Sequence, residues 1–263
     1  MYPTIYKKPA SIGDAVAALA GDSETKVLAG GQTLLATMKQ HLAAPSALVD
    51  IRGLGLSGVS LAGRDLAIGA TTTHAEVAAN ADVQAVCPAL AVLAGSIGDP
   101  LVRNAGTIGG SLANNDPAAD YPAGMLALGA TIVTSKREIA ADDYFQGLME
   151  TALGDDEIIT GLRISAPEQA GYAKFRQPAS RFALVGVFVA RTAGGARVAV
   201  TGAGEDGVFR HSGLEAALSA DWSAAAVDGV EVSADGLMSD IHADADYRAN
   251  LIKVMARRAV ASS

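Results

Sequence analysis

The stretch AGGQTLLATMK, at Ala29–Lys39, carries the pattern that decides the fold of the first part of the chain. The short run Lys26–Leu28 before it predicts a strand, and apolar residues within Gln32–Leu42 recur at helical spacing, so a strand, a glycine turn and a helix are expected. Gly30 and Gly31 form the turn, where the lack of a side chain lets a ligand approach the backbone N–H groups. Because the start of a helix favours an anion, this turn is a candidate phosphate site.

A second glycine pair, Gly109 and Gly110, lies in the sequence TIGGS at Thr107–Ser111. It falls within residues 97–115, which are rich in Gly, Asn and small residues and have little apolar periodicity, so a long functional loop is expected. Two such loops that converge would suit a pyrophosphate. The alternative is that both pairs are merely tight turns in a chain with 29 glycines.

Further from these loops, periodic and alternating apolar patterns predict the other elements. Helices are expected at Asp14–Leu19, from Thr73, at Pro88–Ala94, from Asp116 and Pro117 to Leu128, at Leu214–Leu218 and at Tyr247–Val260. Strands are expected at Leu48–Ile51, in a hairpin over Val59–Ile68, and at Thr131–Thr134, Phe182–Arg191, Ala196–Thr201 and Val208–Arg210. A linker over Glu168–Gly171 is expected to precede a second domain.

The composition limits the classes of function. The 263 residues, half of them hydrophobic, suffice for one large domain or two to three small ones. No apolar run approaches the roughly 20 residues of a membrane helix, so a cytoplasmic protein is expected. The net charge of −8 disfavours nucleic acid as a partner. Cys87 is the one cysteine, so any iron–sulfur cluster would have to sit on another chain, and we expect Cys87 to be buried and structural.

Several patterns that suggest other chemistry are better explained as local structure. G-x-G-x-x-G occurs at Gly53–Gly58 and at Gly202–Gly207, but a strand rather than a helix is expected after each. His242, Asp244 and Asp246 would share one face of a strand as metal ligands; at the start of the last helix the acids would instead cap it, which we favour. The absence of a nucleophile elbow, a Walker A loop and an H-E-x-x-H motif disfavours hydrolase and triphosphatase functions.

Four ordered blocks resemble the FAD-binding medium subunit of the xanthine dehydrogenase and carbon monoxide dehydrogenase family. The blocks are AGGQTLLATMK at Ala29–Lys39, IGDPLVRNAGTIGGSLANNDPAADYPA at Ile97–Ala123, DDEIITGLRI at Asp155–Ile164 and YAKFRQPASRFALVGV at Tyr172–Val187. They span most of the chain, and the second is highly specific.

The resemblance implies an α+β fold. An FAD-binding domain over residues 1–167 would consist of two α/β subdomains, at about 1–56 and 57–167. A C-terminal domain over residues 168–263 would have an antiparallel sheet with helices on one side.

The resemblance also implies which residues bind FAD. The pyrophosphate would be held by N–H groups and hydroxyls of the first loop, Ala29, Gly30, Gly31, Gln32 and Thr33, and of the second, Thr107, Ile108, Gly109, Gly110 and Ser111. Asp120 matches a sugar-binding acid, although its position alone suits an exposed surface residue equally well. Ile97, Ile159 and Thr160 fall at positions that line the cofactor in relatives. A basic residue near the flavin falls on Lys174 or Arg176, between which the sequence does not decide. Asn114 and Asn115 stand where many relatives have a histidine and a small residue.

In this family, substrate is oxidised at a molybdenum cofactor on a large subunit, and electrons pass through two [2Fe–2S] clusters on a small subunit to FAD on the medium subunit. The resemblance therefore implies an electron-transfer oxidoreductase subunit that delivers electrons to an external acceptor within an (LMS)2 heterohexamer. Two alternatives stay open. One is a self-sufficient FAD-dependent oxidoreductase, and the other is a flavin-free scaffold subunit, which the intact glycine pairs do not support.

Overall fold

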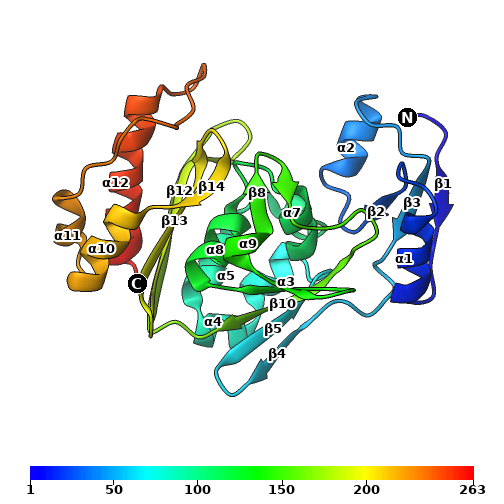
Figure 1. The fold of residues 1–263 in the computed structure, drawn as a ribbon, viewed down its shortest axis with the longest axis horizontal. Helices are drawn as coiled ribbons and strands as arrows, with labels where there is room; N and C mark the ends of the chain where they lie inside the picture. Colours follow the sequence, from blue (N-terminus) through cyan, green and yellow to red (C-terminus); the bar gives the residue numbers. More distant parts are fainter.

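The computed structural model describes all 263 residues, which form three units in a row (Figure 1). Each unit is built around a β-sheet, with strand orders β1-β3-β2, β4-β5-β10-β6-β7 and β11-β12-β13-β14 from the N-terminal to the C-terminal unit. Helices pack on these sheets, so the fold is of the mixed α+β class that the sequence predicts. The structure contains no helix that is both long enough and apolar enough to span a bilayer.

The N-terminal unit is a parallel sheet with two connecting helices. Its elements are β1 (Ile5–Lys7), α1 (Ile12–Ala20), β2 (Lys26–Leu28), α2 (Leu34–Lys39) and β3 (Ala47–Asp50). Parallel strands need crossover connections, which the two helices supply. All four residues of the central strand β3 are buried. Strand β2 therefore ends in the glycine turn at the carboxyl edge of a packed sheet.

The central unit is an antiparallel sheet with most of its helices on one face. Its strands are β4 (Val59–Ala62), β5 (Asp65–Gly69), β6 (Thr131–Thr134), β7 (Glu138–Ala140) and β10 (Ile159–Ser165), with a small hairpin of β8 (Phe145–Gly147) and β9 (Glu150–Thr151). Its helices are α3 (His74–Ala79), α4 (Ala81–Val86), α5 (Pro88–Ser96), α6 (Pro100–Arg103), α7 (Ile108–Asn114), α8 (Asp120–Leu128) and α9 (Ala141–Tyr144). Every residue of α8 is buried, so this helix is the centre of the core.

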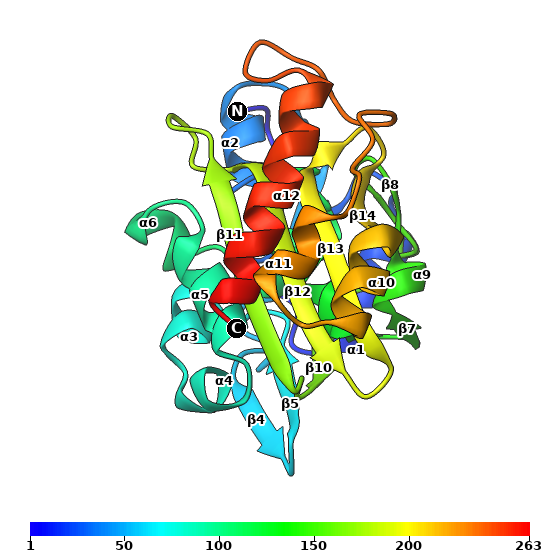
Figure 2. The same ribbon diagram turned by 90° about the vertical axis from the view of Figure 1, so that its left-hand side faces the viewer.

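The C-terminal unit is an antiparallel sheet with its own helices on the outer face (Figure 2). Its elements are β11 (Gln169–Arg176), β12 (Ala183–Thr192), β13 (Gly195–Gly204), β14 (Gly207–Arg210), α10 (Ser212–Ala220), α11 (Ala224–Asp228) and α12 (Ala245–Ala261). Alternate residues of β12 point to opposite faces. Val187 packs in the core beneath α10 and α12, whereas Phe188 packs with α5 and α8 of the central unit. The sheet is therefore covered on both faces, by its own helices and by those of the central unit.

Most of the predicted elements are confirmed, and β2 and β6 have the predicted bounds. The hairpin over Val59–Ile68 is present as β4 and β5, and β14 follows Gly202–Gly207. Asp244 caps α12 by accepting a hydrogen bond from Tyr247 N, as expected. Cys87 is buried, in agreement with the structural role expected for it.

Three predictions are wrong in detail. Residues 97–115 are not one loop, because α6 and α7 lie within them. Helix α8 begins at Asp120, since Asp116 instead accepts a hydrogen bond from Ala118 N in the turn before the helix. The expected linker is absent, because β11 begins at Gln169.

Candidate functional site

A cavity of 490 Å³ lies between the N-terminal and central units. The turn after β2, the start of α7, the first residue of α8, Leu153 and residues 157–159 contribute to its wall. In Figure 1, α2 and α7 face each other from the two units. The structure thus brings together the two glycine pairs, which are about 80 residues apart in the chain, a separation on the scale of long-range tertiary contact.

The turn Ala29–Thr33 offers a row of free hydrogen-bond donors to this cavity. None of the backbone N–H groups of Gly30, Gly31, Gln32 and Thr33 donates to another atom of the protein. Gly31 has a φ of +68°, a left-handed conformation that favours glycine. Successive N–H groups in such a turn form a concave site for an anion. The turn therefore has the donors that a phosphate group requires.

The second glycine loop, Thr107–Ser111, has a different character, because the N–H groups of Ile108–Ser111 already have partners in the protein. The acceptors are Thr72 O for Ile108, Ala70 O for Gly109, Thr107 Oγ1 for Gly110 and Thr107 O for Ser111. Thr107 and Ser111 still have hydroxyl protons that they can donate, since neither hydroxyl donates within the protein. This loop therefore contributes hydroxyls, shape and the N–H of Thr107, which has no partner in the protein, rather than a row of free backbone donors.

The first glycine turn approaches the central unit so closely that Gly30 has no room for a side chain. A Cβ on Gly30 would lie 2.1 Å from Ala105 O. A Cβ on Gly106 would lie 2.6 Å from His74 Nε2, and one on Gly109 would lie 2.7 Å from Ala70 O. Glycine at position 30 therefore lets the two units meet beside the cavity, whereas Gly106 and Gly109 allow close packing within the central unit.

An apolar wall closes the cavity on the side of the N-terminal sheet. Ile158 packs with Val49 and Ile51 in the small core of that unit. Its neighbours Leu153 and Ile159 also line the cavity. This wall can accommodate the apolar face of a ring system.

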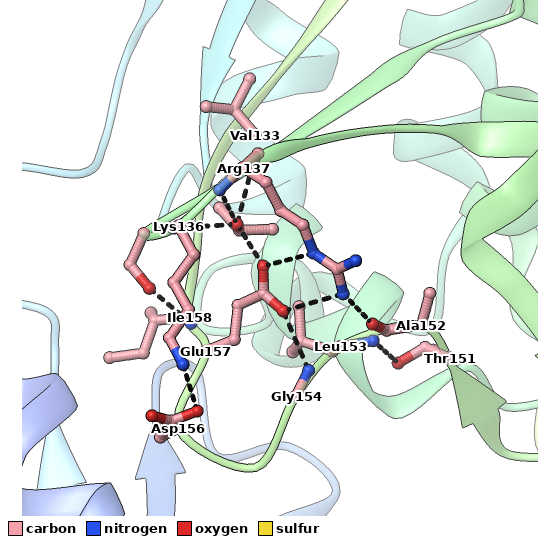
Figure 3. A network of polar contacts seen from close by, with 12 residues as sticks. Val133, Lys136, Arg137, Thr151, Ala152, Leu153, Gly154, Asp156, Glu157 and Ile158 are labelled. Carbon is pink, nitrogen blue, oxygen red and sulfur yellow. Dashed lines mark hydrogen bonds and ion pairs between the residues drawn. The ribbon is translucent and has the colours of Figure 1, made fainter.

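A buried carboxylate fixes the segment that carries this wall (Figure 3). Glu157 accepts hydrogen bonds from Thr134 Oγ1 at 2.5 Å, from Arg137 Nε and Nη2 at 3.2 Å each, and from Gly154 N at 3.0 Å. Burial raises the pKa of Glu157, but these donors together lower it to about 2. The carboxylate is therefore ionised at neutral pH, and it ties the turn between β6 and β7 to the cavity wall.

A second buried carboxylate, Asp120, lies at the start of α8 with 4% of its surface exposed, and it lines the cavity. Its Oδ1 accepts a hydrogen bond from Tyr172 Oη and lies 2.8 Å from Lys174 Nζ. Burial raises the pKa of Asp120 above its ordinary value, whereas Lys174 and Tyr172 oppose that rise. Phe182 lines the cavity as well, just before β12, where Ala183 N donates to Ala118 O.

His74 is the one histidine that lines the cavity. Burial and, to a lesser degree, the positive charge of Arg103 lower its pKa to about 4, so the imidazole is neutral at pH 7. The ring centroid of Tyr121 lies 5.3 Å away. His74 Nδ1 and Tyr121 Oη are both buried without a hydrogen-bond partner.

Twelve of the sixteen predicted site residues line the cavity, namely Ala29, Gly30, Gly31, Gln32, Thr33, Ile97, Thr107, Gly109, Gly110, Ser111, Asp120 and Ile159. Ile108 is instead fully buried in the core, and Thr160 borders a separate depression on the central sheet. Lys174 is buried beside Asp120, and Arg176 is exposed at the end of β11.

Sequence reasoning missed several lining residues, among them His74, Phe182 and Glu157. His74 gave no signal, because a lone histidine has no spacing to identify it. Phe182 was assigned to a strand, whereas it lies just before β12. Glu157 directly precedes the apolar pair Ile158 and Ile159 in the sequence. An acid beside apolar residues that are expected to be buried could have identified it as a lining residue.

The two asparagines that depart from the family pattern have separate roles. Asn114 lines the cavity. Asn115 is buried with a left-handed φ of 42°, and its Nδ2 donates to Gly147 O and Glu150 O. Asn115 thus anchors the β8–β9 hairpin to the end of α7, which is a structural role.

Comparison with known proteins gives consistent results. The family described as the FAD binding domain in molybdopterin dehydrogenase matches residues 2–167. The nicotine 6-hydroxylase medium subunit of Paenarthrobacter nicotinovorans is 34% identical, over 97% of this chain and 95% of that protein. The carbon monoxide dehydrogenase medium chain of Hydrogenophaga pseudoflava is 33% identical over the same shares. A crystal structure of Cu,Mo-CO dehydrogenase contains a chain that is similar in fold, with a TM-score of 0.91 and 34% sequence identity. The match covers 100% of this chain and 98% of that one.

The fold, the cavity and these similarities define the class as an FAD-binding subunit of an oxidoreductase. More specifically, the chain belongs to the FAD-binding medium subunits of the molybdenum hydroxylases. It is an electron-transfer flavoprotein subunit that works with large and small partner subunits.

Proposed function

We propose that the FAD pyrophosphate binds at the turn Ala29–Thr33. The observation that supports this assignment is the run of four free backbone N–H groups that lines the cavity. Such donors stabilise phosphate oxygens without a positively charged side chain. The hydroxyls of Thr107 and Ser111 add donors from the facing loop.

The rest of the cavity suits the other parts of FAD. The apolar wall of Leu153, Ile158 and Ile159 fits an aromatic ring system, and Phe182 adds an aromatic side chain elsewhere in the wall. Asp120 provides a carboxylate oxygen for a hydroxyl of the ribose or ribityl chain. Ile97 extends the apolar lining.

When bound, FAD accepts electrons singly and passes them to an external acceptor such as NAD, oxygen or a quinone. The protein orients it and shields it from water. We assign the electron supply to two [2Fe–2S] clusters on the small subunit and substrate oxidation to the molybdenum cofactor of the large subunit. The assembly would be an (LMS)2 heterohexamer in the cytoplasm. The relatives act on compounds as different as nicotine and carbon monoxide, as their names state, which fits a substrate site on another subunit.

The phosphate site is tested by a pair of glycine variants with equal backbone strain. Gly31 and Gly236 have φ of +68° and +72°, but only Gly31 lines the cavity, and a Cβ on Gly236 meets nothing within 4 Å. We expect Gly31→Ala to lose most of its bound FAD, because the strain and a Cβ that would lie 2.8 Å from Leu35 Cδ1 distort the row of N–H donors. Gly236→Ala should keep its FAD. The measurement is released flavin per chain in the purified complex, and full flavin content in Gly31→Ala would contradict the assignment.

The role of the chain within an enzyme is tested by its visible spectrum after purification with its partners. FAD together with iron–sulfur absorbance and two further subunits supports electron exit through this chain. A colourless single chain would support a scaffold. A lone chain that carries FAD and turns over a substrate would support a self-sufficient oxidoreductase.

A further inference from the structure

The two oxygens of the Asp120 carboxylate have different surroundings. Both protein partners approach the same oxygen, since Tyr172 Oη donates to Oδ1 and Lys174 Nζ lies 2.8 Å from Oδ1. No protein donor binds Oδ2, and Oδ2 is not among the fully buried atoms that lack a partner. Because Asp120 lines the cavity, Oδ2 is the oxygen with access to it.

Lys174 is placed to act on Asp120 rather than on a ligand. Its side chain is 3% exposed, and it is not part of the cavity wall. Asp120 is the only carboxylate within 4.0 Å of its ammonium group. Removal of one member of such a buried pair leaves the other charge uncompensated, which is strongly unfavourable. The charge state of Asp120 therefore depends on Lys174.

The other groups that face Asp120 come from the two elements that surround it. Arg176 and Tyr172 lie on β11 with Lys174, and Tyr121 follows Asp120 on α8. Arg176 is exposed and more weakly coupled to Asp120 than Lys174 is. Tyr121 is neutral, because burial raises the pKa of its hydroxyl well above the ordinary value. Lys174 is thus the main cation that balances the carboxylate.

We infer that Lys174 and Tyr172 are positioning residues, which occupy Oδ1 of an ionised Asp120 and leave Oδ2 as the acceptor for a hydroxyl of FAD. This inference rests on the proposed FAD site. It also separates the two basic residues that the sequence could not distinguish. Lys174 acts through Asp120, and Arg176 is left as the candidate for a direct effect on the flavin.

The test is the pH dependence of FAD affinity. The complex is stripped of flavin and titrated with FAD, between pH 5.5 and pH 9, with flavin fluorescence as the readout. In Lys174→Met, Asp120 loses its counter-charge and takes up a proton more readily. We expect the midpoint of its affinity profile to rise by at least about one pH unit relative to the unchanged protein, with affinity falling up to tenfold for each pH unit below that midpoint.

Three further variants separate this effect from simple damage to the fold. Lys174→Arg keeps the charge and should keep the original profile. Tyr172→Phe should shift the midpoint in the same direction by less, and it preserves the ring that packs against Phe188. Lys253→Met, on helix α12, removes a lysine that donates to Asp228 O and lies outside the cavity wall, and it is the control for loss of a lysine.

The outcomes distinguish the inference from the site on which it rests. Asp120→Asn should bind FAD weakly, because the charged acceptor is lost. The weak affinity should be the same at every pH, because an amide side chain does not titrate. If Asp120→Asn keeps the original affinity, the proposed contact between Asp120 and FAD is wrong. If Asp120→Asn is weakened while Lys174→Met and Tyr172→Phe keep the original midpoint, the site stands and the positioning role is overturned.

Discussion

His74 illustrates how burial sets the charge of a single residue on the cavity wall. Its folded-state pKa of about 4 lies below the ordinary value of 6.5, because water is largely excluded from the ring. Because the imidazole is neutral, it adds no positive charge to the wall that also holds the free N–H donors of Gly30–Thr33. At the residue scale, the proposed phosphate site therefore relies on backbone N–H donors and not on His74.

The depressed pKa of His74 predicts a loss of stability in acid. In the unfolded chain His74 binds a proton below about pH 6.5, whereas in the folded chain it does so only below about pH 4. Stability therefore falls as the pH decreases through this window. We expect this group to lower the free energy of unfolding by about 2 kcal/mol between pH 7 and pH 5. His74→Phe should remove that component, as measured by urea unfolding at both pH values.

An exposed histidine provides the control for this prediction. His242 lies outside the cavity, and His242→Phe should leave the difference between the two pH values unchanged. An equal loss of stability in His74→Phe and the unchanged protein would show that other groups cause the acid sensitivity.

The network around Glu157 operates at the scale of elements. Its hydrogen bonds join the turn between β6 and β7 to the segment before β10, which carries Leu153 and Ile158 into the cavity wall. The hydrogen bond from Arg137 Nη2 to Ala152 O extends the same connection. The hydrogen-bond network of Glu157 therefore holds the apolar wall in position.

Replacement of Glu157 should weaken both the fold and the cofactor site. In Glu157→Gln the negative charge that receives the Arg137 and Thr134 donors is lost, and we expect the free energy of unfolding to fall by about 2 kcal/mol. FAD affinity should fall as well, since the wall loses its support. Thermal unfolding and FAD titration of the purified complex measure the two effects.

A matched control lies on the same sheet. Glu138 pairs with Arg163, but both side chains are about half exposed, so Glu138→Gln should change stability by less than about 1 kcal/mol. Similar losses in the two variants would mean that burial of Glu157 has no special importance. Loss of stability without any change in FAD affinity would separate the network from the site.

The elements also show how far the sequence determines the structure. The bounds of strands β2 and β6 were predicted to the residue. Short runs of β-branched and apolar side chains that are bounded by polar residues or glycine are typical of strands. Helix α7 was missed because it contains two glycines, which are poor helix formers. Its first N–H groups bond to carbonyls of Thr72 and Ala70, and such tertiary partners leave no trace in a local pattern.

In the candidate site, too, features with a local sequence pattern were predicted, and features that depend on tertiary contacts were not. The glycine pairs were visible, because bare backbone beside hydroxyl side chains is itself a sequence pattern. The roles of Glu157 and of the pair Asp120 and Lys174 were not visible. Each depends on a contact between segments that are 20 or more residues apart.

At the scale of the whole molecule, the central and C-terminal units share one core. Tyr172, Phe188, Ala190 and Ala199 from the C-terminal sheet belong to the same buried cluster as α5 and α8. A Cβ on Gly124 in α8 would lie 3.0 Å from Leu93 Cδ1 and 3.6 Å from Phe188 Cδ2, so the packing there is tight. The sheet therefore completes the core of the central unit.

This shared core predicts that residues 1–167 do not fold stably alone. Without the C-terminal sheet, the buried face of α8 would be exposed to water, a loss of the order of 2 kcal/mol for each large apolar side chain. We expect the fragment to show no cooperative thermal transition in near-ultraviolet circular dichroism and to bind the dye ANS. The full chain is the control, and a cooperative transition in a fragment that binds FAD would contradict the prediction.

The unpaired N–H groups of Gly30–Thr33 have a practical consequence for anyone who prepares the flavin-free protein. Sulfate and inorganic phosphate present the same tetrahedral oxygens as a cofactor phosphate, and a row of open donors does not distinguish between them. Salting-out with ammonium sulfate or storage in phosphate buffer would fill the turn with a competing oxyanion and slow reconstitution. Chloride-based buffers are therefore the appropriate medium in which to return the flavin.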